Sequence, residues 1–347
     1  MLCAINPGST STKIGIFKNR TKLTESIISH SVEEISSFPD VWAQYEGRLE
    51  AIKNLLSQYD YTYSAIIGRG GLLKPLSRGT YRVNHAMIQD ARAGRRGQHV
   101  SNLGCALADA VAKEYGAKAF VVDPVSVDEF HDLARFSGHP LIERRALSHA
   151  LNLRAAAIKA AEQLVIDIES SRFVVAHMGG GISIAALLNG RIIDVNDASS
   201  DGPFSPERTG GLPLQPFVDL CFSGKYEKQD IKKMVMGEGG LIAYLGSNDM
   251  QEIERKIEHG DQFAARVVSA MVYQICKEIG AMHSVLDNQL DAIVLTGGLA
   301  FSERVTKPIC KKFETHTILI YPGQDELEAM ALGALRVLTG QESVLLY

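Results

Sequence analysis

Two turns in this 347-residue chain carry the residue types that bind phosphate. The first lies in Asn6-Pro-Gly-Ser-Thr-Ser-Thr-Lys13, and the second lies in His177-Met-Gly-Gly-Gly-Ile-Ser183. Each follows an apolar stretch, contains glycine and leads into a second apolar stretch. Glycine lets backbone N–H groups approach an anion closely, so two such turns predict a clamp for a polyphosphate. Two ordinary hairpins are the alternative, and the spacing of a Walker loop is absent.

Charged residues follow two further apolar stretches. Arg69 stands between Gly68 and Gly70, and a guanidinium can bind carboxylate or phosphate through two parallel bonds. Asp123 follows the stretch 119–122, and ligands gather where strands of an α/β sheet end. The structural alternatives are an arginine on a surface loop and an aspartate that caps a turn.

Three more segments contain candidate ligand-binding residues. His149 lies at a predicted helix start, Arg208 lies in the polar, glycine-containing loop 201–213, and Gly297-Gly298 follows a predicted strand. Bare backbone at such a glycine pair would let a nucleotide base or ribose lie against it. A structural histidine and a glycine pair needed for packing remain the alternatives.

The elements that must position these residues repeat. Strands are predicted at 2–6, 13–18 and 24–29, and again at 173–177, 182–188 and 191–195. Further strands at 64–68, 119–122, 291–296 and 318–321 alternate with helices at 40–58, 99–115, 148–168, 261–286 and 325–338. We expect Ser148 to be an N-cap, and the helix over 261–286 to be buried between layers because most of its faces are apolar. This order predicts duplicated mixed-sheet α/β domains.

Composition limits the class of protein. Hydrophobic residues make up 46%, charged residues 22%, and the net charge is −4, which argues against nucleic acid as a partner. No apolar run is long enough to span a bilayer, and the N-terminus leads directly into a strand pattern, so we expect a cytoplasmic protein. The five cysteines are widely spaced and odd in number, which predicts reduced thiols rather than disulfides or a zinc site.

Taken in order, these segments resemble the acetate/butyrate kinase family of the acetate and sugar kinase, Hsc70 and actin superfamily. The resemblance covers essentially the whole chain and is closest to butyrate kinases in segments 123–129, 142–152 and 202–208. It implies an α/β, two-domain actin-like (ribonuclease H-like) fold with an interdomain cleft. The implied domains are residues 1–123 plus 322–347, closed by the C-terminal helix, and residues 124–321, which carry the adenosine-binding turn.

The resemblance also implies an activity. The expected reaction is reversible, Mg²⁺-assisted phosphoryl transfer from ATP to butyrate, giving butyryl phosphate and ADP. The expected assembly is a homodimer or a higher homo-oligomer. The alternatives are a kinase that prefers isobutyrate, propionate or acetate, a phosphatase of the same fold, and a non-catalytic nucleotide-binding module. A carboxylate with a pKa of roughly 4–5 is already ionised at neutral pH, so this kinase needs no general base, whereas a sugar kinase does.

The residues that the resemblance assigns fall into three groups. The implied catalytic residues are Arg69, Asp123, His149 and Arg208. The implied nucleotide-binding residues are Asn6, Ser9, Ser11, Lys13, His177, Gly179, Gly180, Gly181, Asp249, Gly297, Gly298 and Ala300. The implied metal-binding residues are Asn6, Asp123 and Glu326, with Asp325 and Glu328 as alternatives to Glu326. Gly180 departs from acetate kinases, which carry asparagine at that position.

Overall fold

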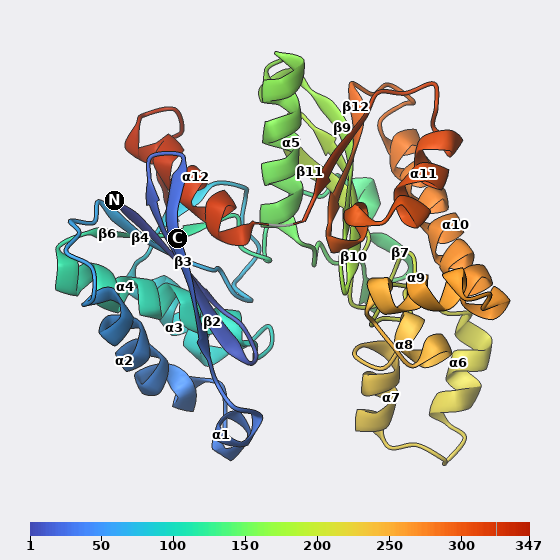
Figure 1. Ribbon diagram of the computed structural model, residues 1–347, viewed down its shortest axis with the longest axis horizontal. Helices are drawn as coiled ribbons and strands as arrows, with labels where there is room; N and C mark the ends of the chain where they lie inside the picture. The colour runs from blue at the N-terminus through green and yellow to red at the C-terminus, as the bar shows by residue number, and fades with distance from the viewer. Residues whose placement is uncertain (324) are drawn as a thin grey trace. The chain divides into compact units, whose positions relative to one another are not determined.

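The chain divides into two compact units in a computed structural model, which describes residues 1–323 and 325–347. Unit 1 comprises Met1–Asp128 and Asp325–Tyr347, and unit 2 comprises Glu129–Gln324. Figure 1 shows the elements of both units. Within the described residues, no helix combines the length and the hydropathy that a membrane span needs.

Unit 1 is built on a seven-stranded mixed sheet with the order β14-β5-β6-β4-β1-β2-β3. Its strands are β1 (Leu2–Pro7), β2 (Ser11–Lys18), β3 (Thr21–Ser29), β4 (Ala65–Gly68), β5 (Thr80–Arg82), β6 (Lys118–Val122) and β14 (Leu345–Leu346). Strands β1, β2 and β3 form an antiparallel meander, while β1, β4 and β6 are parallel. The parallel strands therefore end at one edge of the sheet, where they bring Asn6, Arg69 and Asp123.

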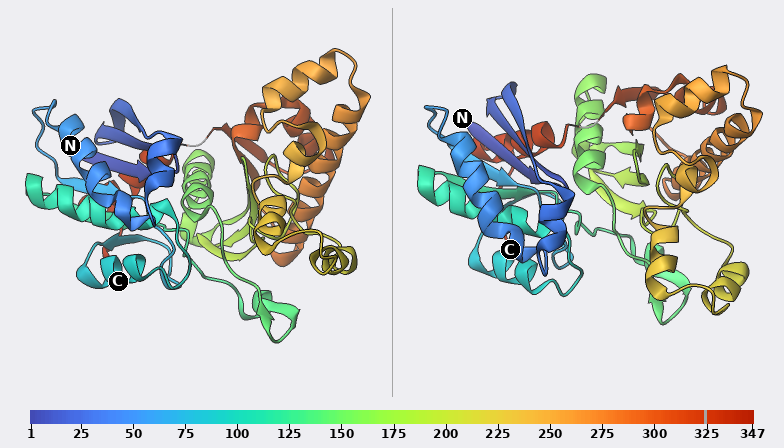
Figure 2. Two further views of the ribbon diagram at one scale, coloured as in Figure 1. Left: turned by 90° about the horizontal axis from the view of Figure 1, so that it is seen from below. Right: turned by 60° about the horizontal axis from the view of Figure 1, so that its bottom comes forward.

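Helices cover both faces of this sheet, as Figures 1 and 2 show. On one face, Ile52 of α2 and Leu107 of α4 join a core with Ile5 and Ile66. On the other face lies α12, where a Cβ at Gly333 would come within 2.3 Å of Val122. The helical elements of unit 1 are α1 (Val32–Ser37), η1 (Trp42–Gln44), α2 (Tyr45–Leu56), α3 (His85–Ala93), η2 (Val100–Leu103), α4 (Gly104–Tyr115) and α12 (Glu326–Leu338).

Unit 2 repeats the order of five of the seven strands of unit 1, from β3 to β6. Its five-stranded sheet has the order β11-β10-β9-β12-β13, with β9, β10 and β11 antiparallel and β9, β12 and β13 parallel. These strands are β9 (Arg172–Met178), β10 (Ile182–Leu188), β11 (Arg191–Val195), β12 (Ala292–Gly297) and β13 (Ile318–Pro322). The sequence-based prediction of duplicated mixed-sheet α/β domains is confirmed.

Helix α5 packs on one face of the second sheet, and α10 and α11 pack on the other (Figure 1). The remaining helices and a small hairpin extend from this core. The elements are η3 (Asp132–Arg135), β7 (Phe136–His139), β8 (Ile142–Glu143), α5 (Ala150–Leu164), η4 (Ile168–Ser170), α6 (Leu214–Cys221), α7 (Lys228–Val235), α8 (Gly240–Leu245), α9 (Met250–Glu258), α10 (Gln262–Val285), η5 (Gly298–Phe301) and α11 (Glu303–Lys312). All five cysteines are free thiols, as predicted.

Three expectations about helices differ from the structure. Helix α10 is not buried between layers, because Phe263 and Tyr273 are exposed while only one stripe, which includes Met271, is buried. Ser148 does not cap α5: the N-cap residue is His149, whose amide contacts the Ser183 hydroxyl at 3.4 Å. The helix itself begins at Ala150. The same helix ends at Leu164, short of the expected 168, because Val165 adopts a left-handed conformation with φ of 57°.

Candidate functional site

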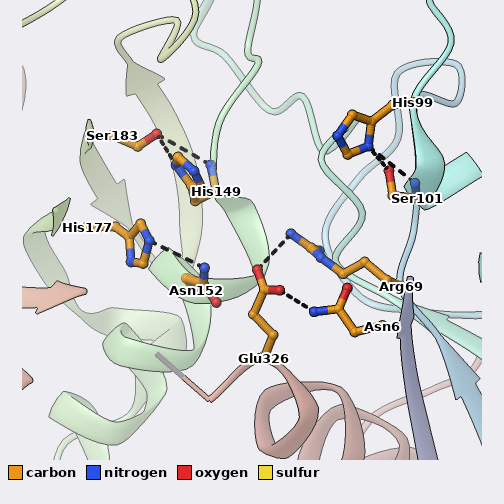
Figure 3. A network of polar contacts seen from close by, with 9 residues as sticks. All are labelled: Asn6, Arg69, His99, Ser101, His149, Asn152, His177, Ser183 and Glu326. Carbon is orange, nitrogen blue, oxygen red and sulfur yellow. Dashed lines mark hydrogen bonds and ion pairs between the residues drawn. The ribbon is translucent and has the colours of Figure 1, made fainter. Parts of the chain in front are cut away.

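Asn6, Arg69 and Glu326 meet at the edge of the first sheet. Asn6 lies in β1, Arg69 follows β4, and Glu326 begins α12. The Glu326 carboxylate accepts a hydrogen bond from Asn6 Nδ2 at 2.6 Å and lies 3.3 Å from Arg69 Nη2. Figure 3 shows the Glu326 carboxylate facing both of the other two side chains. An amide, a guanidinium and a carboxylate from three separate segments are therefore joined in one network.

The three acidic residues at the start of α12 differ in their contacts. Asp325 is the N-cap, accepting a hydrogen bond from the Glu328 amide at 2.8 Å, and it also pairs with Lys22 at 2.6 Å. Glu328 is exposed. Only Glu326 of these three reaches Asn6 and Arg69. Because it belongs to this network, Glu326 is a better candidate than Asp325 or Glu328 for the carboxylate nearest a ligand.

Arg69 is a buried residue, with 6% of its surface exposed, so the surface-loop alternative is excluded. Within the described residues its Nη1 atom is buried and has no hydrogen-bond partner. The flanking glycines allow this burial, because a Cβ at Gly68 would lie 2.0 Å from the Gly104 carbonyl and one at Gly70 would lie 2.3 Å from Pro124. A guanidinium held in this way retains hydrogen-bonding capacity for an anionic ligand.

Asp123 lies at the same sheet edge, because Gly68 of β4 pairs with Val121 of β6. Its carboxylate is buried, and Oδ1 accepts a hydrogen bond from the Gly79 amide at 2.7 Å. This bond joins Asp123 to a residue 44 positions earlier, so it is not the cap of the following turn that the structural alternative supposes. Its φ of +36° is left-handed and strained for a residue that is not glycine. Such strain persists only where the surrounding structure enforces it.

The first turn is closed by a hydrogen bond from the Gly8 amide to the Ser11 carbonyl at 2.7 Å. Ser9 is exposed, and Ser11 is half-buried. Lys13 of β2 pairs directly with Asn6 of β1, so the two side chains share one face of the sheet. Hydroxyls, an ammonium and an amide are thus available on the same side.

In unit 2, two histidines face each other across α5 and β9. The rings of His149 and His177 are 4.7 Å apart. His149 Nδ1 is 2.9 Å from the Ser183 hydroxyl, and His177 Nε2 is 3.5 Å from Asn152 Nδ2 (Figure 3). Strand pairing sets this arrangement, because His177 of β9 lies opposite Ser183 of β10. Both rings therefore have fixed orientations.

Arg208 lies directly on the second turn. A Cβ at Gly181 would come within 2.4 Å of Arg208 Nη1, so glycine is required for this approach. The same Nη1 donates to the Ala198 carbonyl at 2.8 Å. Burial lowers the pKa of the Arg208 guanidinium, while Glu207 and Asp197 act in the opposite direction. A cation is thereby held against a glycine-rich turn.

The residues predicted near adenosine have structural roles of their own. Gly297 has a φ of +91°, and a Cβ there would lie 2.4 Å from the Met178 carbonyl, so packing alone requires this glycine. Gly298 has open space where its Cβ would be, and Ala300 is buried. Asp249 is the N-cap of α9 and accepts hydrogen bonds from the Gln251 and Glu252 amides. Of these residues, Gly298 leaves its backbone most accessible to a ligand.

Sequence reasoning missed three polar residues around these groups. Ser183 and Asn152 orient the histidines, and Glu207 accepts a hydrogen bond from Asn248 Nδ2 at 2.8 Å beside Gly180. A signal for Asn152 was available, since residues three apart on a helix share a face and Asn152 lies three positions after His149. Glu207 gave no such signal, because its neighbour Gly180 is distant in the sequence.

Comparisons with known proteins agree with this architecture. The model of the acetokinase family matches residues 143–343. Butyrate kinase 2 of Clostridium acetobutylicum is 45% identical over 100% of this chain and 99% of its own length. A probable butyrate kinase 2 of Caldanaerobacter subterraneus is 47% identical over 99% of this chain and 98% of its own length.

A solved structure supports the fold. The crystal structure of Porphyromonas gingivalis acetate kinase superposes with a TM-score of 0.82 at 18% identity, covering 97% of this chain and 99% of that one. At this identity the likeness concerns the fold alone, and it confirms the expected two-domain actin-like fold.

Proposed function

Because the chain belongs to the acetokinase family, we propose that it is a butyrate kinase, which transfers a phosphoryl group from ATP to butyrate. The observation that carries this proposal is the 45% identity to Clostridium acetobutylicum butyrate kinase 2 over the full length of both chains. The products are butyryl phosphate and ADP, and the acceptor group is a carboxylate.

The chemistry of a carboxylate acceptor fits the residues of unit 1. A short-chain acid with a pKa of roughly 4–5 is ionised at neutral pH and needs no base to become a nucleophile. The obstacle is repulsion between this anion and the phosphates of ATP. Arg69, with its buried and unpartnered Nη1 atom, supplies a positive charge that is only partly neutralised by Glu326. We assign Arg69 to the substrate carboxylate or to the transferring phosphoryl group.

The residues of unit 2 supply further donors. Arg208 is held on the second turn by Gly181 and the Ala198 carbonyl, and we assign it to the negative charge of the transferring phosphoryl group. His149 and His177 are assigned to the same charge, as hydrogen-bond donors whose rings are oriented by Ser183 and Asn152. Preorganised donors of this kind require no rearrangement when charge develops.

Mg²⁺ fits the oxygen donors of unit 1. The described residues include no group of three or more histidine, cysteine or acidic side chains that could hold a metal ion alone. Mg²⁺ is usually held by one or two carboxylates together with substrate phosphates and waters. Asp123 and Glu326 provide two carboxylates, and Asn6 provides an amide oxygen, so we propose these three as its protein contacts. When bound, the ion supplies charge neutralisation on the nucleotide phosphates.

We further propose a cytoplasmic homodimer or higher homo-oligomer. Large apolar side chains that are exposed in the single chain, among them Phe136, Leu141 and Phe222, are available to a subunit interface. Size-exclusion chromatography with light scattering measures the mass directly. A monomeric mass at micromolar concentration would refute the oligomer.

A hydroxylamine trap tests the reaction itself. The wild-type protein with Mg²⁺, ATP and butyrate should yield butyryl hydroxamate in step with ADP. Arg69→Ala should lower this rate on the order of 10²–10³-fold, since it removes a charge contact to the reacting groups. Lys307→Ala, which removes an exposed cation on α11, is the matched control and should retain full activity.

Two outcomes would refute the proposal. ADP release without hydroxamate would indicate a hydrolase, because no acyl phosphate would then form. Nucleotide binding without any acid-dependent ADP release would indicate a non-catalytic module.

A further inference from the structure

Arg48 is a buried cation that lies directly behind the first turn. It belongs to α2, and only 3% of its surface is exposed. We propose that Arg48 is a positioning residue that fixes residues 8–12 in the conformation that receives the nucleotide phosphates. This inference rests on the proposed function, in which the first turn binds those phosphates.

The Arg48 guanidinium contacts the turn at three points. Nη1 donates to the Thr12 hydroxyl at 2.9 Å and lies 3.5 Å from the Ser11 carbonyl, and Nη2 donates to the Ser9 carbonyl at 3.3 Å. Gln44 holds the other side of the guanidinium, because its Oε1 accepts from Nε at 3.1 Å and from Nη2 at 2.9 Å. A planar, multidentate donor is thus clamped between α2 and the turn.

His30 supports the same turn from the end of β3. Its ring Nε2 lies 3.0 Å from the Thr12 hydroxyl, and its backbone amide donates to the Thr10 carbonyl at 2.9 Å. The Gly8 amide donates to the Ser11 carbonyl at 2.7 Å. Three successive carbonyl groups, from Ser9 to Ser11, therefore each accept a hydrogen bond.

Held carbonyls determine where the amides point. In a trans peptide, the C=O of one residue and the N–H of the next point in opposite directions. Fixing the Ser9 and Thr10 carbonyls therefore directs the Thr10 and Ser11 N–H groups away from their partners. Ser9 and Thr10 are exposed whereas Thr12 and Arg48 are buried, so the turn has an open side opposite the guanidinium. Backbone N–H groups on the open side of such a turn can bind an anion.

A purely structural role for Arg48 makes a different prediction. If Arg48 served only the core, its loss would lower stability and leave the nucleotide affinity of the folded protein unchanged. If Arg48 positions the turn, its loss lowers nucleotide affinity in a protein that is still folded. Loss of a residue that orients a direct contact typically costs about 10- to 100-fold.

The experiment measures ADP binding by calorimetry in the full-length chain with Mg²⁺, together with the KM values for ATP and butyrate. Arg48→Met should weaken ADP binding and raise the KM for ATP by about 10- to 100-fold, with the KM for butyrate changed by less than about twofold. Arg48→Lys should recover part of the affinity, because an ammonium can still donate to one carbonyl. The melting temperature of each variant reports its folding.

Arg336→Met is the matched control. It removes a largely buried cation from the same unit, where Arg336 pairs with Glu342 at 2.8 Å, and it should leave ADP affinity unchanged. Thr12→Val removes the hydroxyl that accepts from Arg48, and it should weaken ADP binding by about tenfold. Thr12→Val therefore tests whether Arg48 positions the turn if Arg48→Met does not fold.

If Arg48→Met folds and binds ADP with wild-type affinity, the positioning role is overturned. If Arg48→Met does not fold, wild-type ADP affinity in Thr12→Val overturns it instead. An equal rise in both KM values would overturn it as well. Calorimetry on the wild type separates a failure of the positioning role from a failure of the proposed function. A wild-type protein that binds ADP without making acyl phosphate would sink the kinase assignment alone.

Discussion

At the scale of single residues, an arginine lies beside glycine in each unit. Arg69 lies between Gly68 and Gly70, each of which faces backbone or side-chain atoms too closely for a Cβ. Gly181 differs, because its missing Cβ leaves room for the Arg208 guanidinium itself. The glycines beside Arg69 instead let the backbone on either side of it pack against Gly104 and Pro124.

Gly181→Ala tests the pairing of Gly181 with Arg208. The added Cβ would lie 2.4 Å from Arg208 Nη1, so the guanidinium must move, and we expect butyrate kinase activity to fall on the order of 10²-fold. Gly280→Ala in α10 is the control, because nothing lies within 4 Å of its added Cβ. It should keep full activity and gain up to about 1 kcal/mol in stability. Equal activity in both variants would contradict the pairing.

Glu278 makes stability depend on pH. Burial, followed by the negative charges of Asp201 and Asp194, raises the pKa of its carboxyl from 4.5 to about 7, although Arg144 and Lys277 oppose the shift. The folded state therefore retains this proton above the pH at which the unfolded state loses it. It follows that the free energy of unfolding falls as pH rises from 4.5 to about 7 and then levels off.

Glu278→Gln should remove that fall. At pH 8 we expect the variant to be more stable than the wild type by roughly 1–3 kcal/mol, with little difference at pH 4.5, as measured by urea unfolding. Glu314→Gln, at an exposed position, is the control. If the difference in unfolding free energy between the wild type and Glu278→Gln stays constant with pH, Glu278 does not titrate in this range.

Asn6 and Arg69 stood out from the residues around them, whereas Glu326 was implied only by the family resemblance, with Asp325 and Glu328 as alternatives. The structure joins these three side chains in one network, and their functional roles stay predictions. Arg48 had no motif, because its partner Thr12 is 36 positions away and its role depends on how α2 packs against β2. Contacts of this kind arise only from tertiary structure.

Secondary-structure elements were predictable where hydrophobic patterns were strong. The three antiparallel strands in the main sheet of each unit, β1 to β3 and β9 to β11, lie within a few residues of the predicted ranges. The position of helix α10 was also predicted correctly. Its predicted burial was wrong, because an apolar composition on several faces does not reveal which face is covered. The short helices α6 to α9 were missed because each spans only six to nine residues, too few for a helical period to stand out in the sequence.

Helix α9 provides a prediction at this scale. Asp249 Oδ1 accepts hydrogen bonds from the amides of Gln251 at 2.9 Å and Glu252 at 3.4 Å, so Asp249→Ala should lower the free energy of unfolding by about 1 kcal/mol. Asp249→Asn should restore stability, because asparagine caps equally well. Denaturant unfolding measures both variants, and wild-type stability in Asp249→Ala would disprove the capping role. An unchanged KM for ATP in Asp249→Ala would remove this residue from the nucleotide site.

The whole molecule contains two copies of one strand order with different chemistry. Unit 1 carries hydroxyls, an amide, carboxylates and Arg69, while unit 2 carries bare glycine, two histidines and Arg208. The repeat was therefore detectable as a pattern of strands, although the residues at the two turns differ.

The preferred acid is the property of the whole enzyme that most directly tests the central claim. One methylene group changes discrimination by only about 1–3 kcal/mol, so neighbouring acids should differ by about 10- to 200-fold at most. The measurement is kcat/KM for straight-chain acids from C2 to C6 with saturating ATP, using the hydroxamate trap. We predict a maximum at butyrate. A maximum at acetate, or no acyl hydroxamate with any acid, would contradict the assignment as a butyrate kinase.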